Sequence, residues 1–300
     1  MEIWIPITIF AAFAQSARSA LQKHLTSSLS TAGATQARFF FAVPFALLYV
    51  AVLHFGGGIP LPALNLRFVA FAVTGGLAQV LATVLFVQLF SYRNLFVGTA
   101  FSKTETIQTA VLGFVVLGDT VSVGAVAGMA IGVVGVIVIS AAHTAKIAAS
   151  GLSAIRSRAT LLGLGVGFFF GIAASSFRGA SLSLDGGYLI QAAVTLAFVL
   201  TLQAVLIAVW LVIREPGQMT AMLKNSRVAA LVGLAGMVAS AGWFSAMTLV
   251  DAATVKAVGQ VELVFAFVTS VVLFRERPNA LEIGGIALIT IGIVVLLQFR

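Results

Sequence analysis

Ten long apolar segments fill almost all of this 300-residue chain and constrain its fold more than any other feature. Each is close to the roughly 20 residues that an α-helix needs to cross a bilayer. The segments cover residues 3–21, 32–52, 68–90, 95–117, 121–141, 160–182, 188–213, 229–250, 253–274 and 280–298. Strands of membrane barrels alternate apolar and polar residues, whereas these segments are continuous. The sequence therefore predicts an all-α, polytopic membrane protein with ten transmembrane helices.

The last five segments repeat the first five about 157 residues later, so that Glu105 aligns with Glu262 and Asp119 with Glu276. We predict two five-helix repeats, at residues 1–144 and 160–300, joined by a loop at 145–159. Because each repeat has an odd number of spans, the two copies must have opposite orientations in the membrane. Inverted repeats are typical of transporters that open alternately to the two sides.

The composition narrows the class of protein further. Hydrophobic residues make up 60% of the chain and charged residues 9%, against about 25% charged residues in soluble domains. The chain has no cysteine and only three scattered histidines, so no metal site or other cofactor is predicted. It has neither a nucleotide-binding loop nor a nucleophile–base arrangement, so we expect neither an ATPase nor an enzyme.

The basic residues between the segments predict the orientation. The gaps after segments 1, 3, 5, 7 and 9 contain Lys23, Arg93, Lys146, Arg156, Arg158, Arg214, Lys224, Arg227, Arg275 and Arg277. The other gaps and the two tails contain only Arg67 and Arg300. The positive-inside rule then places both termini outside the cell. The net charge of +8 is thus explained by topology, and we expect no nucleic-acid partner.

Glu105 and Glu262 are the first candidate functional residues, because charged groups at membrane depth are rare and costly. Both lie near the middle of their segments. Two carboxylates in a cavity of low dielectric favour keeping at least one protonated, which would couple proton movement to transport. The alternative is that each glutamate only neutralises a nearby lysine or arginine.

Lys103, in the fourth segment, is the candidate for binding an anionic group of a substrate. The alternative is an ion pair with Glu262 or Glu105, and the two roles can alternate. The other predicted substrate contacts are hydroxyl, amide and aromatic side chains: Thr99, Thr106, Gln108, Gln260, Trp243 and Phe265. Gln260 aligns with Lys103, so the two repeats are chemically different, as an asymmetric substrate requires.

Four further basic residues complete the predicted charge network. Lys256 lies about two turns from Glu262 and can alternatively extend to the interface. Arg18 and Arg178 lie near the ends of their segments in similar contexts. They are either interfacial anchors or a gate or tie to another helix. Arg38 lies about a turn and a half into the second segment.

Glycines spaced every four residues predict close helix packing. One set lies in the fifth segment and the other in the sixth. They comprise Gly124, Gly128 and Gly132, and Gly163, Gly167 and Gly171.

The duplicated layout resembles the drug/metabolite transporter superfamily, EamA type. Leu117-Gly118-Asp119 precedes Gly128 and Gly135, and Arg275-Glu276-Arg277 precedes Gly285 and Gly292. Asp119 replaces the glutamate that is usual in the family. The resemblance implies a central cavity formed by both repeats, with the fifth and tenth helices packed as a scaffold. It also implies that Asp119 and Glu276 are structural.

The expected function is secondary transport of small metabolites, namely export of amino acids or related carboxylates by proton-coupled or facilitated alternating access. Exchange of nucleotide sugars or sugar phosphates, and flipping of a lipid-linked group, are the alternatives. We expect a multi-pass protein of the plasma (inner) membrane that works as a monomer, with a homodimer as the alternative.

Overall fold

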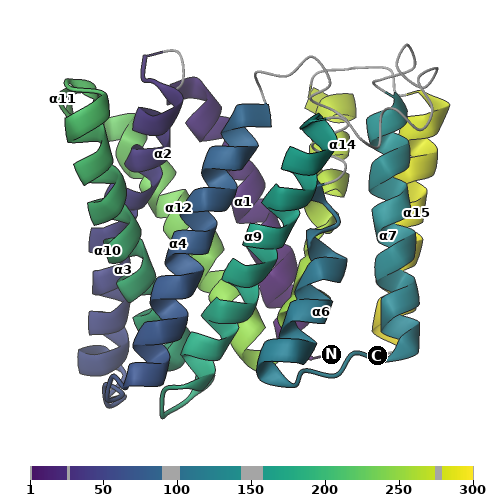
Figure 1. Ribbon diagram of the computed structural model, residues 1–300, viewed down its shortest axis with the longest axis horizontal. Coiled ribbons are helices and arrows are strands. Elements are labelled where there is room, and N and C mark those ends of the chain that lie inside the picture. Colours follow the sequence, from purple (N-terminus) through teal and green to yellow (C-terminus); the bar gives the residue numbers. More distant parts are fainter. Residues whose placement is uncertain (1, 26–27, 90–101, 143–157, 274–278, 300) are drawn as a thin grey trace. The chain divides into compact units, whose positions relative to one another are not determined.

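The computed structural model describes residues 2–25, 28–89, 102–142, 158–273 and 279–299, and every regular element within these ranges is a helix (Figure 1). The prediction of an all-α chain is confirmed. The elements are α1 (Trp4–Leu25), α2 (Thr31–Phe40), α3 (Ala42–Ala51), the π-helical turn η1 (Val52–Gly56), α4 (Leu66–Leu89), α6 (Glu105–Leu117), α7 (Val123–Ala142), α9 (Arg158–Leu182), α10 (Tyr188–Arg214), α11 (Gln218–Lys224), α12 (Ser226–Leu249), α13 (Ala252–Gly259), α14 (Val261–Leu273) and α15 (Ala280–Gln298).

Seven helical stretches in the described part of the chain are long and apolar enough to cross a membrane. They are Thr31–Gly56, Leu66–Phe86, Val123–Ser140, Thr160–Leu182, Tyr188–Arg214, Ser226–Leu249 and Ala280–Gln298. Each corresponds to one of the ten predicted segments, and the chain is an integral, multi-pass membrane protein.

The other three predicted segments differ from a single long apolar helix for three different reasons. The first segment forms α1, whose second half carries polar residues such as Gln15 and Arg18 and is therefore less apolar. The structure describes the fourth only from residue 102 onward, and its helix α6 begins at Glu105. The ninth is divided into α13 and α14.

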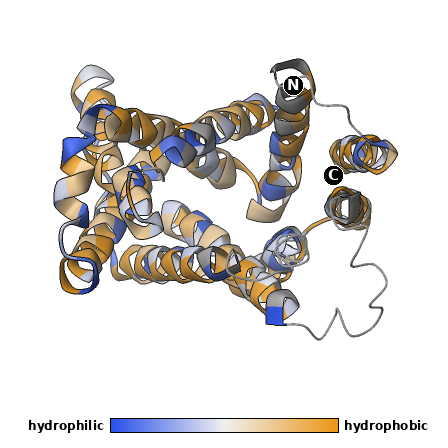
Figure 2. Cartoon of the chain, turned by 90° about the horizontal axis from the view of Figure 1, so that it is seen from above, coloured by the Kyte–Doolittle hydropathy of each residue, from blue (hydrophilic) through white to orange (hydrophobic). Residues whose placement is uncertain are grey.

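Large apolar side chains remain exposed along the helices, and apolar residues predominate on them in Figure 2. Val212 and Ile213 of α10, for example, are 65% and 70% exposed. A soluble monomer rarely leaves contiguous apolar surface uncovered, so lipid must cover these faces.

The chain forms two compact units, each built from both repeats. Unit 1 comprises Met1–Leu77 and Ser176–Leu249, and unit 2 comprises Ala78–Ser175 and Val250–Arg300. Two of the three unit boundaries fall within helices, since α4 and α9 each contribute residues to both units, and the third follows the end of α12 at Leu249.

In unit 1, α1 packs along α12, and α10 packs against α2, α3 and α12. Two buried amides link its helices through backbone carbonyls. Gln36 donates from Nε2 to the carbonyl of Ala204 at 2.9 Å, and Gln203 donates to that of Gly76 at 3.2 Å. These bonds pair each amide nitrogen with a backbone oxygen, and an unpaired polar group is costly in an apolar interior.

In unit 2, α7 and α15 pack along their length, as predicted for the fifth and tenth segments. Glycines allow the two backbones to approach. A Cβ atom at Gly128 would lie 2.6 Å from the carbonyl oxygen of Gly292, and one at Gly135 would lie 2.7 Å from that of Gly285. The repeat-equivalent glycines, Gly128 with Gly285 and Gly135 with Gly292, thus lie along one helix pair.

Candidate functional site

The candidate site of unit 2 begins with two helix breaks at equivalent positions of the repeats. Gln260 separates α13 from α14 by a tight turn: its amide donates to the carbonyl of Ala257 at 3.2 Å, and Leu263 donates back to Gln260 at 2.9 Å. In the first repeat, Lys103 and Thr104 form a turn directly before α6. Interrupted helices at membrane depth are typical of transporter binding sites.

Each break places an acidic residue in the first turn of the following helix. Glu105 opens α6, and Glu262 is the second residue of α14. The backbone amides at a helix N-terminus carry partial positive charge, which attracts a negatively charged group.

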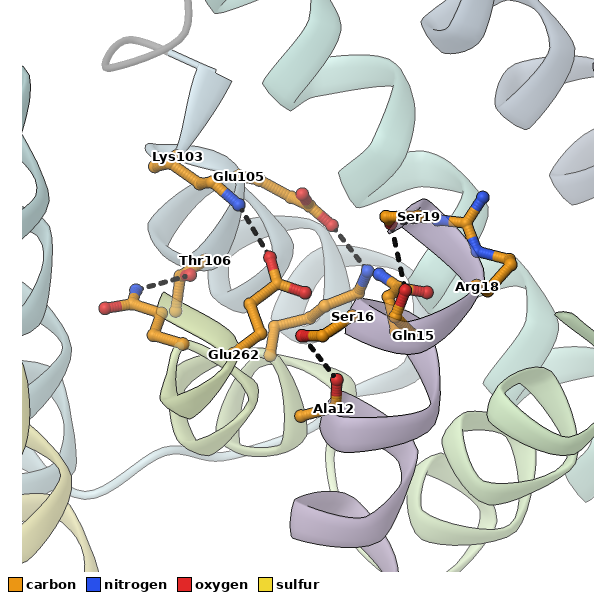
Figure 3. A network of polar contacts seen from close by, with 11 residues as sticks. Ala12, Gln15, Ser16, Arg18, Ser19, Lys103, Glu105, Thr106 and Glu262 are labelled. Carbon is orange, nitrogen blue, oxygen red and sulfur yellow. Dashed lines mark hydrogen bonds and ion pairs between the residues drawn. The ribbon is translucent and has the colours of Figure 1, made fainter. Parts of the chain in front are cut away.

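Two ion pairs cross between the repeats (Figure 3). Lys103 Nζ lies 3.0 Å from Glu262 Oε1, and Lys256 Nζ lies 2.7 Å from Glu105 Oε1. Each lysine therefore pairs with the glutamate of the opposite repeat, and the four charges sum to zero. In this structure, Lys103 and both glutamates thus form the ion pairs that the sequence analysis gave as their alternative role.

These ion pairs are not sealed in the interior. The side chains of Lys103 and Glu262 are 34% and 23% exposed, and those of Lys256 and Glu105 are 29% and 16% exposed. Part of each charged side chain is therefore not packed against the described protein, unlike a group in a fully packed core.

Neutral polar residues surround the breaks, and several were singled out by the sequence. Gln260 donates from Nε2 to Thr106 Oγ1 at 3.2 Å, with both side chains buried. Gln108 donates from Nε2 to Thr104 Oγ1 at 2.8 Å. The Oε1 atom of Gln108 is buried and has no hydrogen-bond partner within the described residues.

Glycines of α9 support the break before α6. A Cβ atom at Gly167 would lie 3.0 Å from the carbonyl oxygen of Ser102 and 3.1 Å from the amide of Glu105, and one at Gly171 would lie 3.2 Å from Thr109 Oγ1. The predicted close packing is thus confirmed for these two glycines. Sequence reasoning missed Thr104 and the role of Gly167 at the turn, although the glycine spacing was a usable signal.

The two arginines with similar sequence contexts make different contacts, both within unit 1. Arg178 donates from Nη1 to the carbonyl of Met247 at 2.7 Å, in the last turn of α12, and so ties α9 to that helix end. Arg18 donates from Nη1 to Gln22 Oε1 at 2.5 Å and from Nη2 to Ser19, both on its own helix.

The remaining candidates are distributed over both units. Arg38 lies on α2 and Trp243 on α12, both in unit 1, and Phe265 lies on α14 in unit 2. Thr99 lies outside the described residues. Asp119 donates its amide to the carbonyl of Gly113 and so closes the C-terminus of α6, while Glu276 also lies outside the described residues.

Comparison with known proteins identifies the family. The model of the EamA-like transporter family matches residues 2–141 and again residues 157–298. No curated protein matches the chain significantly. Among 28 matching chains of solved structures, one described only as "Crystal structure of protein" is 16% identical, with a TM-score of 0.72 over 99% of this chain and 98% of that chain. At this level of sequence identity, the similarity shows a shared fold and nothing about function. Since the family model matches both repeats, the chain belongs to the EamA-like transporter family and is a membrane transporter of the drug/metabolite type.

Proposed function

We propose that this protein is a plasma-membrane carrier that exports a small zwitterionic metabolite, an amino acid or related carboxylate, by proton-coupled alternating access. The observation that carries the proposal is the pair of crossed ion pairs, Lys103–Glu262 and Lys256–Glu105, at the helix breaks of unit 2.

The charges of this network match those of an amino acid. Its carboxylate would replace a glutamate beside Lys103, and its ammonium would replace a lysine beside Glu105 or Glu262. Such an exchange keeps every charge paired, which matters where the effective dielectric constant is low. A doubly charged phosphate would instead bring two further negative charges to a site that already holds two carboxylates, and like charges are unfavourable there.

The same pairs would support proton coupling. Protonation of either glutamate would remove the partner of its lysine, Lys103 for Glu262 and Lys256 for Glu105, and leave that ammonium available to the substrate carboxylate. Loss of that proton would restore the pair and displace the substrate. Gln260 and Thr106, hydrogen-bonded beside the break, would supply neutral contacts to the substrate.

Proteoliposomes provide the test. Counterflow of labelled amino acids and of labelled sugar phosphates would be measured with and without a pH gradient. We expect amino-acid counterflow that accelerates with the gradient, and loss of that acceleration in Glu105→Gln. Asp185→Asn is the matched control, because Asp185 is an exposed carboxylate of a loop.

Two results would overturn parts of this proposal. Exchange of sugar phosphates that is indifferent to pH would make the protein an exchanger and recast both glutamates as partners of the lysines. Unchanged pH dependence in Glu105→Gln would exclude that carboxylate from proton coupling.

A further inference from the structure

Arg38 of α2 is a charged group in the apolar interior whose role the ion-pair network does not explain. It lies within the membrane-spanning stretch Thr31–Gly56 and is half-buried. Within the part of the chain that the structure describes, its guanidinium makes no hydrogen bond or ion pair; it stacks 5.0 Å from the ring of Phe39. A guanidinium has five N–H donors, so an arginine in this position retains a large unused capacity to bind an acceptor.

A second guanidinium lies beside it. The stems of Arg18 on α1 and Arg38 on α2 converge on Gly236: a Cβ atom there would lie 3.3 Å from Arg18 Cδ and 3.4 Å from Arg38 Cγ. Gly236 is near the middle of α12, which is itself a membrane-spanning helix. The absence of a side chain at this position lets both stems pass, and Arg38 experiences the positive charge of Arg18. Two like charges at this depth repel each other, and ionisable residues within membrane spans are costly and mark functional sites.

Neighbouring side chains hold Arg18 in place. Gln22 accepts from Arg18 Nη1 at 2.5 Å, and Gln22 Nε2 points at 3.4 Å to the carbonyl of Ala34 on α2. Ser19 accepts from Arg18 Nη2 at 3.1 Å. Figure 3 shows Arg18 beside Ser19 on α1. These contacts orient Arg18 relative to α2, the helix that carries Arg38, so the two groups are positioned before any ligand arrives.

We propose that Arg18 and Arg38 form an oxyanion-binding site in unit 1, which takes a carboxylate or phosphate group. Planar guanidinium groups match the paired oxygens of such ligands, whereas chloride offers no such pair. The anion would neutralise the repulsion between the arginines and satisfy the donors of Arg38. The crossed pairs of unit 2 are already neutral, so the site differs from them in charge. It does not depend on which molecule the protein transports.

The test is thermal unfolding of the purified full-length protein in detergent at constant ionic strength, with chloride replaced stepwise by acetate or by inorganic phosphate. We expect the Tm of the unchanged protein to rise with oxyanion concentration and to saturate. The saturable part of the rise should be absent in Arg38→Gln and preserved in Arg214→Gln, which changes an exposed arginine of the same unit. Phosphate also stabilises proteins non-specifically by exclusion from their surface, and Arg38→Gln measures that background.

The comparison of acetate with inorganic phosphate identifies which kind of oxyanion the site binds. A saturable shift with acetate assigns a carboxylate, a shift with phosphate alone assigns a phosphate group, and equal shifts assign a general oxyanion site. Equal shifts in Arg38→Gln and in the unchanged protein would overturn the proposal.

A second measurement separates binding from packing. In chloride alone, Arg38→Gln should unfold at the same temperature as the unchanged protein or higher, because it removes a like-charge contact. A lower Tm there would show that Arg38 is a structural residue, and would overturn the proposal. Because neither measurement requires transport, a failure of the amino-acid counterflow would not affect them.

Discussion

At the residue scale, Lys103 and Glu262 illustrate how a charged pair can be both stable and exchangeable. Their side chains are 34% and 23% exposed, so neither is fully enclosed by the described protein. Pairs in such settings stabilise a protein by about 1 kcal/mol or less, whereas fully buried charges depend strongly on their partners. Under the proposed function, a substrate that offers equivalent charges would displace either partner at little cost.

Removal of one partner of this pair should be worse than removal of both. We expect Lys103→Gln and Glu262→Gln each to lower the free energy of unfolding by about 1 kcal/mol, because each leaves one charge unpaired. The double variant should recover most of that loss, and thermal unfolding of the four proteins measures the coupling. Strictly additive losses would mean that the pair contributes nothing to stability.

Arg178 should act through its bond to the end of α12. Arg178→Gln removes a charged donor from the carbonyl of Met247, and charge-assisted hydrogen bonds contribute about 1.5–3 kcal/mol. The Tm should fall accordingly, with partial rescue by Arg178→Lys. Arg158→Gln, which changes an exposed arginine at the other end of α9, is the control and should leave the Tm unchanged. An equal fall in both glutamine variants would contradict the tie.

At the element scale, the break between α13 and α14 depends on one side chain that reaches another helix. Gln260 donates to Thr106 of α6 and also lies over α7, where a Cβ atom at Gly132 would come within 2.7 Å of its Oε1. The end of a glutamine side chain moves easily, so this close contact controls where the amide points more than whether the helices pack.

Gly132→Ala should therefore alter transport without unfolding the protein. We expect its free energy of unfolding to stay within about 1 kcal/mol of the parent. Loss of the Gln260–Thr106 bond, worth about 1 kcal/mol, should change the initial rate of counterflow about fivefold. Thr106→Val removes the acceptor, so Gly132→Ala should have no further effect in that background. Independent effects of the two changes would contradict this reasoning.

Adjacent glycines of α15 provide a sharper test of the α7–α15 packing. A Cβ atom at Gly285 would collide with Ile139 Cγ1 and would lie 2.7 Å from the carbonyl oxygen of Gly135, whereas one at Gly284 would meet nothing within 4 Å. Gly285→Ala should lower the free energy of unfolding by about 1–3 kcal/mol through overpacking. Gly284→Ala should be neutral or slightly stabilising, because alanine favours the helix. Similar Tm values for both variants would show that the two helices separate easily.

At the scale of the whole molecule, the compact units do not follow the repeats. Each unit combines residues of both halves, and the polypeptide passes between the units within α4, within α9 and after the end of α12. An inverted repeat therefore need not fold as two successive domains, because its copies interleave. The network of charged pairs and the arginine pair consequently belong to different units, although each contains groups from several segments.

The predicted orientation can be tested on the whole molecule because the chain has no native cysteine. Gly187 and Lys224 lie beyond opposite ends of α10, so a single membrane-spanning helix separates them. If both termini are outside, Gly187→Cys should react with a membrane-impermeant maleimide in intact cells. Lys224→Cys should react only after permeabilisation. The reverse pattern would invert the topology.

The sequence alone was sufficient for the helical class, the membrane location and the repeat. Long apolar runs act locally, because each must satisfy its own backbone hydrogen bonds in lipid. The sequence was also sufficient to select Glu105, Glu262 and Lys103, because a charge at membrane depth is conspicuous without knowledge of its neighbours. It did not predict the break at Gln260, since the apolar pattern of the ninth segment continues through it.

Partner choice was decided only by the tertiary structure. Lys103 lies two residues from Glu105 in the chain but pairs with Glu262, and two arginines in similar contexts make unrelated contacts. The convergence of Arg18 and Arg38 on Gly236 likewise joins residues far apart in the sequence. Hydrophobicity and charge are properties of each residue, so composition and spacing reveal them. Distances between helices depend on how all of them pack, and no single segment of the sequence carries that information.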